Sequence, residues 1–324
     1  MRKILLVMLA LVLSFAFIGC GGSDDAVLGV NIPAPEFNGD NADPAIINAS
    51  NSQAIVDAAM SIGYVYMGVD EAMSPLDYMN SILNVVDAGS IQNGIINGCD
   101  GSVGGDDTGG SGLITVTKLM EHAGGGGEMT MEFDSFVVYE PYAGDETTCH
   151  ASAVITSGFM NVSVYESATA ESGTISMYGV NIQKAGSNLT FDGTIVFSES
   201  WNNTTFDASG SVASSVKMTD ESGSAGTNET MFVNYTENWS WDESANTETQ
   251  TFGGTLYTPA DGIVWVSTTT PVLDVSGTIE EGKVRLSTST SGNYIDLLMD
   301  LEEWSGFVAP NTYPGGFFTI IQGY

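Results

Sequence analysis

Hydrophobic and polar residues alternate along most of the chain after about residue 95. The clearest alternation covers residues 129–139, 189–198 and 295–301. Because successive side chains of a β-strand point to opposite faces, each run predicts a strand with one apolar and one polar face. Strands of this kind are typical of antiparallel sheets, since parallel sheets are usually covered on both faces.

Short clusters rich in Gly, Asn, Asp and Ser separate these runs. They include residues 124–127, 184–188 and 220–228, and they are too short to hold the helical crossovers that parallel strands need. The sequence therefore predicts a mainly β fold built as a long antiparallel β-meander. A flat sheet of this length would leave exposed edges, so we expect the sheet to be curved or partly closed.

A short motif repeats within the β region. Gly-Thr-Ile occurs at residues 173–175, 193–195 and 277–279, with Gly-Thr-Leu at 254–256. Each copy opens or enters a predicted strand. The intervals between the copies are unequal, so they indicate repeated hairpins and not a solenoid of fixed period.

Before residue 95 the hydrophobic period is helical. The segment 48–62 begins with Ser50 and Ser52, either of which is a candidate N-cap. Its apolar stripe at helical spacing consists of Ile55, Ala58, Ala59 and Ile62. A second stripe follows Ser74-Pro75, a pair typical of a helix start, and continues to Gly89. We therefore expect two short N-terminal helices packed on the sheet.

The beginning of the chain has the pattern of a secretory signal peptide. Arg2 and Lys3 supply a positive start, residues 4–18 are apolar apart from one serine, and Gly19 is small. An apolar run of this length is typical of signal peptides and is short for a membrane-spanning helix.

The tetrapeptide Phe17-Ile18-Gly19-Cys20 resembles the lipobox of bacterial lipoproteins. The resemblance implies that Cys20 is diacylated and becomes the mature N-terminus, so that lipid anchors the protein to the membrane. Gly21 replaces the aspartate that retains lipoproteins in the inner membrane of enteric bacteria, which favours the outer membrane. The alternative is an ordinary secretory signal followed by an incidental cysteine.

The sequence divides into three parts by composition. Residues 1–19 are the expected signal peptide. Residues 20–44 are rich in Gly, Asp, Asn and Pro without a sustained period, which predicts a flexible tether. Residues 45–324 are long enough to form a single helix-plus-antiparallel-β domain with a sizeable core.

The expected mature chain is strongly acidic. It contains forty Asp and Glu residues against five cations, namely Lys118, Lys184, Lys217, Lys283 and Arg285. A chain of this charge is repelled by nucleic acid and by anionic lipid headgroups, so neither is an expected partner.

Two cysteines, Cys99 and Cys149, remain once Cys20 is assigned to the lipid. An even number of cysteines in an oxidising compartment predicts a disulfide. Closing a loop of about fifty residues is worth about 4 kcal/mol in the chain-entropy estimate. The bond would tie the start of the β region to the strand that begins at Cys149.

Several segments resemble uncharacterised Gly/Ser/Thr-rich β proteins of proteobacterial envelopes. They are DPAIINASNSQAIVDAAMSI at 43–62, CDGS at 99–102, FDGTIVFS at 191–198, GIVWVSTTTPV at 262–272 and SGTIEEGKVRLS at 276–287. The resemblance implies a fold type and no activity. The acidic turn at Glu280-Glu281 departs from that pattern.

The sequence offers few groups for catalysis. Its two histidines, His122 and His150, lie far apart, and it contains no Gly-x-Ser-x-Gly nucleophile motif. We therefore expect neither enzyme activity nor a cofactor. A structural zinc site is not expected either, because both cysteines of the domain are assigned to the disulfide.

A glycine-rich loop is a weak calcium candidate. Residues 99–110 contain Asp100, Asp106 and Asp107, and Ca²⁺ takes oxygen ligands of this kind. Their spacing fits neither an EF-hand nor an RTX nonapeptide. An acidic, solvated loop is therefore the favoured interpretation.

One predicted strand, residues 231–241, places Tyr235, Trp239 and Trp241 on a single face if no bulge intervenes. The favoured interpretation is that this face is the core of the sheet, where aromatic side chains bury large areas. The alternative is an exposed aromatic platform on which sugar rings stack, with Glu237 and neighbouring Asn side chains bonding to the hydroxyls.

Together these patterns predict a lipid-anchored cell-envelope protein, periplasmic or surface-facing, with a non-catalytic structural or interaction role. Its expected partner is an envelope protein or a glycan. The first alternative is a glycan- or ligand-binding envelope lipoprotein. The second is a small outer-membrane β-barrel-like protein, which the apolar and aromatic-ended segment GGFFTIIQGY at 315–324 suggests.

Overall fold

The computed structural model of the protein describes part of the chain. The described residues are 35, 43–48, 50–62, 65, 113–121, 125–142, 145–184, 186–222, 228–258, 260–276, 278–289, 293–298 and 319–323. Within them lie one α-helix, α2 (Ser52–Met60), and thirteen β-strands. No helix in this part of the chain is both long enough and apolar enough to cross a membrane.

The strands follow one another along the chain, mostly with short connections. They are β1 (Leu113–Glu121), β2 (Gly126–Asp134), β3 (Phe136–Tyr142), β4 (Asp145–Glu166), β5 (Ala170–Lys184), β6 (Ser187–Trp201), β7 (Ala208–Asp220), β8 (Asn228–Asp242), β9 (Thr247–Thr258), β10 (Gly262–Val275), β11 (Thr278–Ser287), β12 (Tyr294–Leu298) and β13 (Thr319–Gly323).

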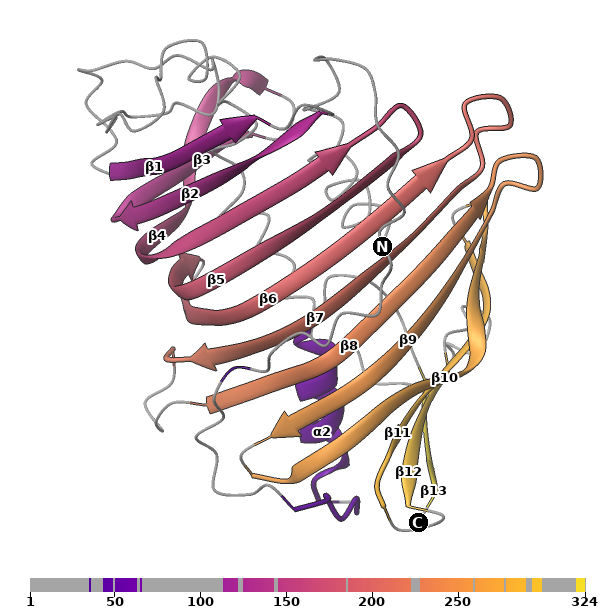
Figure 1. Ribbon diagram of the computed structural model, residues 1–324. Coiled ribbons are helices and arrows are strands. Elements are labelled where there is room, and N and C mark those ends of the chain that lie inside the picture. Colours follow the sequence, from indigo (N-terminus) through magenta and orange to yellow (C-terminus); the bar gives the residue numbers. More distant parts are fainter. Residues whose placement is uncertain are drawn as a thin grey trace.

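All of these strands belong to one antiparallel sheet (Figure 1). Each strand from β4 to β12 pairs with the next in the chain, while β1 pairs with β2 and β2 pairs with β4. Strand β3 pairs with β4 beside this path. Within the described residues, β1 and β13 end the path and do not pair with each other. The predicted antiparallel meander is therefore confirmed, and the sheet is not closed.

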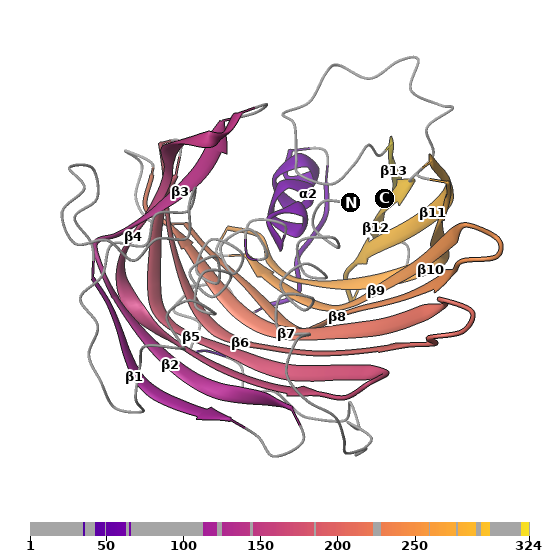
Figure 2. The ribbon, with the colours of Figure 1, turned by 90° about the horizontal axis from the view of Figure 1, so that it is seen from above.

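The sheet bends around a hollow in which α2 lies (Figure 2). Ile55 and Val56 of α2 belong to the same apolar core as Met160, Phe191 and Leu256 of the sheet, and all five are fully buried. The core therefore lies on the concave face. The apolar side of the alternating strands points into the hollow, and the polar side points outward.

A line of β-bulges crosses the sheet. Gly158 in β4, Gly193 in β6 and Gly254 in β9 have φ angles of 108°, 141° and 133°, and each lies on a strand that faces a bulge in β5 or β8, where the pairing shifts register. A Cβ atom at Gly193 would lie 2.2 Å from the carbonyl oxygen of Ser215, so no larger residue fits there. Bulges bend and twist the strands that carry them, which gives the sheet its curvature.

The bulge at Asn234 in β8 shows how the apolar face is kept. Asn234 has a φ angle of 46°, and the pairing of β8 with both of its neighbours shifts near it. As a result, Phe232 and Tyr235 are both buried although they are three residues apart. Their rings meet edge to face with centroids 5.6 Å apart.

Two copies of the motif lie elsewhere than predicted, whereas Thr278 of the 277–279 copy begins β11 as expected. Gly193 and Gly254 lie well inside β6 and β9, opposite bulges in β5 and β8, and not where a strand begins. The interpretation of these copies as hairpin signals is therefore wrong. A glycine with positive φ is needed at an in-strand bulge as well as at a turn, and the sequence alone does not separate the two.

Local boundaries also differ from the sequence predictions. The first predicted helix is confirmed, but its N-cap is Asn51, which makes no side-chain capping bond, and not Ser50 or Ser52. The run predicted as one strand over 129–139 is broken at Ser135, whose φ angle is 54°, into β2 and β3. The second predicted helix, after Ser74, lies outside the described residues.

The segment that leads into α2 is fastened to two turns at one end of the hollow. The side chain of Asn293 accepts the Ile47 N–H and donates to the Ile47 carbonyl, both at 2.8 Å. Asn51 Nδ2 donates to Asp261 Oδ1 at 3.0 Å. These bonds join residues far apart in the sequence, so they fix the helix against the turns before β10 and β12.

Candidate functional site

The other end of the concave face carries glutamate and tryptophan side chains in place of aliphatic ones. It lies where β4 joins β5, β6 joins β7 and β8 joins β9 (Figure 1). We call it the acidic-aromatic end, and its members are Glu166, Glu171, Glu199, Trp201, Glu237, Trp239, Trp241, Glu248 and Gln250.

Strand register places these side chains on the concave face. In β5, Glu171 has the same parity as the buried residues Ile175 and Met177, so it points to the same side. Residues that pair directly across strands share a face. One row therefore crosses six strands through Glu166, Glu171, Glu199, Gly210, Trp239 and Gln250. A second row beside it contains Trp201, Ala208, Trp241 and Glu248.

Three glutamates of the first row are direct neighbours. Glu171 pairs with Glu166 on one side and Glu199 on the other, and only 4% of its surface is exposed. Burial raises the pKa of Glu171 to about 8, with the charges of Glu166 and Glu199 adding to the effect. Burial also raises the pKa of Glu199 to about 7 and that of Glu166 above its usual value. Glu171 is therefore mainly protonated at neutral pH.

A fourth carboxyl lies on β8, the strand that carries Trp239 and Trp241. Glu237 precedes Trp239 by two residues, and burial raises its pKa to about 7 although part of the side chain is exposed. The charge of Glu248, on the neighbouring strand, adds to this shift. Burial and the charge of Glu237 in turn raise the pKa of Tyr235.

Trp239 occupies a slot that a glycine provides. A Cβ atom at Gly210 would lie 2.6 Å from Trp239 Nε1, so the indole lies directly over Gly210 on the neighbouring strand. An aromatic ring over a glycine of the next strand is a known way to fill a sheet surface. Trp241 lies farther along the same strand, and its Nε1 donates to Glu243 Oε2 at 2.8 Å. Both indoles are half-buried.

Gln250 completes the first row. Its side chain is buried, and its Nε2 donates to Glu248 Oε1 at 2.6 Å. Its Oε1 is enclosed and has no hydrogen-bond partner within the described part of the chain. Buried polar atoms are almost always paired in proteins, so this oxygen is an unusual feature.

The three aromatic residues of the predicted platform share one face of the sheet but differ in how deeply they are buried. Tyr235 lies in the core, with 6% of its surface exposed, whereas Trp239 and Trp241 are partly exposed. All three follow the bulge at Asn234 and lie on the concave face. The structure adds Trp201, which shares the second row with Trp241.

Sequence reasoning missed the glutamates and Gln250. Glu171 and Glu199 have the same parity as buried apolar residues in their strands, and this parity was the available signal. No sequence pattern marks Gln250 as a site residue, because the partners of its side chain follow from strand pairing.

The other predicted site residues are placed only in part. Cys20, Cys99 and the calcium candidates Asp100, Asp106 and Asp107 lie outside the described residues, as does His122. Cys149 lies in β4 opposite Pro141, and His150 lies opposite Glu140. In the described part of the chain, no group of three or more His, Cys, Asp or Glu side chains is arranged to hold a metal ion.

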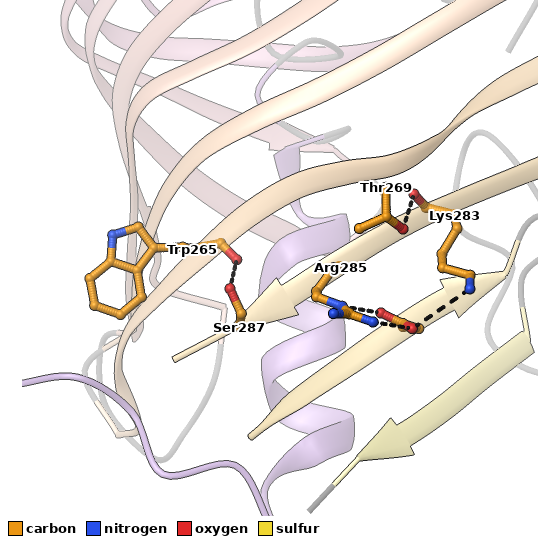
Figure 3. A network of polar contacts seen from close by, with 6 residues as sticks. Trp265, Thr269, Lys283, Arg285 and Ser287 are labelled. Atoms are coloured by element: carbon orange, nitrogen blue, oxygen red, sulfur yellow. Dashed lines mark hydrogen bonds and ion pairs between the residues drawn. The ribbon is translucent and has the colours of Figure 1, made fainter. Parts of the chain in front are cut away.

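The outer face of the sheet carries a separate polar network (Figure 3). Arg285 lies between the inward-pointing Val284 and Leu286 and therefore points outward. Its guanidinium bonds to both carboxylate oxygens of Asp296 at 2.6 and 2.8 Å. It also lies over the ring of Tyr294, with its central carbon 3.9 Å from the ring centroid. This network ties β11 to β12.

Two more side chains extend the outer network. Lys283 Nζ lies 4.0 Å from Asp296 Oδ2. Ser287 Oγ donates to the Trp265 carbonyl at 3.4 Å. The indole of Trp265 is part-exposed on this face, between the buried residues Val264 and Val266.

Comparison with known proteins gives no further assignment. No protein-family model, no curated protein and no solved structure matches the chain. The function is therefore inferred from the groups on the concave face, which offers carboxyls, indole rings and an enclosed amide oxygen in one place.

Proposed function

We propose that this protein is a non-catalytic lipoprotein of the bacterial cell envelope that binds a ligand at the acidic-aromatic end of its concave face. The main support is that Trp239 and Trp241 stay half-exposed on a face whose other large side chains form the core. Indole rings supply a flat apolar surface with a polar edge. The carboxyls and amide beside them are the kind of polar groups that orient a bound molecule.

The surroundings of Glu171 favour binding over catalysis. Its carboxyl is almost completely buried between two other glutamates, so a substrate has little access to it. The two rows contain no His, Cys or Lys, the side chains that most often complete an acid–base or nucleophilic pair. The acidic-aromatic end is therefore better suited to hold a molecule than to transform it.

The envelope location in this proposal rests on the sequence. Residues 1–19 have the signal-peptide pattern, and Phe17 to Cys20 resemble a lipobox. Two acyl chains on Cys20 would hold the domain stably on a membrane, whereas one would hold it only marginally. The excess of carboxylates keeps the domain itself away from anionic headgroups.

Cys20→Ser is expected to abolish membrane retention. Without the thiol no acyl chain can be attached, so the protein should accumulate as uncleaved precursor or appear in the soluble fraction. Membrane fractionation after a salt wash, with mass spectrometry of the N-terminus, measures both outcomes. Cys149→Ser serves as the matched control and should stay lipidated. A wild-type protein that washes off and has an unlipidated N-terminus would contradict the anchor.

The ligand proposal predicts that protein extracted from its own envelope in mild detergent retains a small molecule. Native mass spectrometry should show an added mass on the wild type that is lost in Trp239→Ala, because the ring that contacts the ligand is gone. Trp265→Ala is the matched control, since it removes a part-exposed indole from the outer face, and it should keep the mass. An equal added mass on all three proteins, or none on the wild type, would contradict the proposal.

A neutral glycan is the second candidate ligand. Trp239 and Trp241 lie on one face with Glu237 beside them, and sugar rings stack on aromatic faces while carboxyls bond to their hydroxyls. A retained mass composed of hexose or hexosamine units would favour this candidate.

A further inference from the structure

The turn between β6 and β7, residues 202–207, carries an exposed aromatic side chain. Phe206 is 67% exposed, more than any other described aromatic residue. It lies in the turn itself and in neither row of the acidic-aromatic end. A ring that stays in water to this extent adds little to the stability of the core.

The backbone of Phe206 has a conformation that bulky residues rarely adopt. Its φ angle is 61°, in the left-handed region where Gly and Asn are far more common. The other non-glycine residues with positive φ in the described part of the chain are small or polar, namely Ser135, Asn234, Asn246 and Ser276. An exposed phenylalanine at such a position costs stability, and strain of this kind is typically kept at binding sites.

Hydrogen bonds hold the turn in one shape. The Phe206 N–H donates to the Asn202 carbonyl, and the Asn202 N–H donates to the Asp207 carbonyl, both at 2.8 Å. The side-chain oxygen of Asn202 accepts the N–H groups of Thr204 and Thr205 at 2.8 and 3.2 Å. A binding loop whose shape is fixed in advance loses little conformational entropy when it docks.

The turn is also tied to the turns on both sides of it. Asn203 Nδ2 donates to the carbonyl of Ala168, in the β4–β5 turn, at 3.1 Å. The N–H of Glu243, in the β8–β9 turn, donates to Asp207 Oδ1 at 3.1 Å. The three turns therefore form one fixed surface at this end of the sheet, with Phe206 exposed on it.

The charge of this surface is negative. The three turns contain Asp207 and Glu243, Asp242 directly precedes the last of them, and none contains Lys or Arg. Hydrogen bonds from the Ser244 hydroxyl and the Ala245 N–H lower the pKa of Asp242, so its carboxylate stays charged. An exposed ring with carboxylates beside it is complementary to an apolar pocket with cations at its rim.

The chain enters the sheet at the opposite end. Pro44 forms a parallel bridge with Ile263 at the start of β10. Strand β9 leads from there back to the β8–β9 turn over twelve residues, which is about 40 Å. A flexible chain between Cys20 and Pro44 spans about 25 Å on average. A domain anchored through Cys20 therefore presents the β6–β7 turn away from its membrane.

We propose that the β6–β7 turn is a docking site for another envelope protein that has a basic surface. Phe206 enters an apolar pocket of that protein, and Asp207, Asp242 and Glu243 pair with Lys or Arg at the rim of the pocket. A second copy of this chain fits poorly, because a chain with a formal net charge of −33 repels its own kind. The inference takes the envelope location from the proposed function but does not depend on the ligand.

Thermal melting of the full mature protein tests whether Phe206 has a structural role. Asparagine is tolerated in the left-handed conformation, so Phe206→Asn should melt at the wild-type temperature or up to about 2 °C above it. Phe191→Asn is the contrasting variant, because it removes a fully buried ring, and it should melt far below the wild type. If Phe206→Asn also melts many degrees lower, the ring serves the fold and the proposal is overturned.

Photo-crosslinking in the intact envelope tests the docking itself. The photoreactive residue p-benzoylphenylalanine at position 206 should form an adduct with one protein, which mass spectrometry identifies. The same probe in place of Phe159, an exposed residue of β4, should not form this adduct. The identified protein, once purified, should bind the wild type at least about tenfold more tightly than Phe206→Asn. This affinity should fall as salt is added, and Phe159→Asn should bind as the wild type does.

Three results would overturn the proposal. They are the absence of an adduct specific to position 206, an adduct with a second copy of the chain or with lipid, and a partner whose binding Phe206→Asn leaves unchanged. Retention of a small molecule is measured separately, and Phe206→Asn should keep the added mass. A wild type without an added mass would therefore overturn the ligand proposal and leave the docking site standing.

Discussion

Raising the pH from about 5 to about 8.5 is expected to destabilise the protein, mainly through Glu171. The folded-state pKa of this residue is raised to about 8, so the folded protein binds a proton that the unfolded chain has already lost near its ordinary pKa of 4.5. Stability therefore falls with pH wherever the folded state binds more protons. The contribution of protonated Glu171 to stability is fully present below its unfolded-state pKa and is lost as the pH rises through its folded-state pKa of about 8.

The expected size of this effect is large for a single group. One pKa unit corresponds to about 1.4 kcal/mol, so complete ionisation of Glu171 predicts a loss on the order of 4 kcal/mol. Glu199, with a pKa raised to about 7, should add a smaller loss at slightly lower pH. Glu166 faces the same cluster, and its own raised pKa acts in the same direction.

Thermal melting of the wild type and of Glu171→Gln across this pH range measures the effect. The glutamine keeps the shape and cannot ionise, so the variant should melt at nearly the wild-type temperature near pH 5 and well above it near pH 8.5. Glu199→Gln is the graded control and should remove a smaller part of the slope. A Glu171→Gln variant whose melting temperature falls with pH as steeply as that of the wild type would show that ionisation of Glu171 is not the cause.

Arg285→Ala is expected to lower the free energy of unfolding by about 3 kcal/mol. Asp296 is 5% exposed and receives two charge-assisted bonds from this guanidinium. Removing Arg285, whose side chain is 34% exposed, leaves the buried Asp296 charge without its main compensation. The expected loss is at the lower end of the roughly 3–5 kcal/mol typical of fully buried ion pairs. Lys283, at 4.0 Å from the same carboxylate, offsets only part of the loss.

Denaturant unfolding with a matched lysine variant tests this prediction. Lys283→Ala removes a longer ion pair from a side chain that is more than one third exposed, so it should cost about 0–1 kcal/mol. The double variant Arg285→Met, Asp296→Leu should regain most of the loss, because apolar residues often replace a buried ion pair without penalty. Equal effects of the arginine and lysine variants would mean that the buried pair is not the cause.

The sequence predicted the sheet because its burial is one-sided. Met129, Met131 and Phe133 alternate with polar residues and are buried as expected. The same holds for Ile295 and Leu297 near the end of the sheet. An alternation of this kind depends only on the local strand, so a sequence pattern is enough to find it.

The sequence did not predict the bulges or the acidic-aromatic end. Gly193 interrupts a strand without ending it, and glycine marks a turn equally well. The site depends on which residues lie opposite one another, for example Glu171 with Glu199 and Trp239 with Gln250. Such pairs follow from register across several strands, and a bulge in any of them changes the pairing.

The consecutive order of the strands has a consequence for how the chain folds. From β4 onward each strand pairs with the one made just before it, so most contacts are local in sequence and the sheet can grow one hairpin at a time. The bonds between Ile47 and Asn293 are different, because they join residues 246 positions apart. The helix can therefore dock onto this end of the hollow only after β11 and the turn that follows it have been made, late in synthesis.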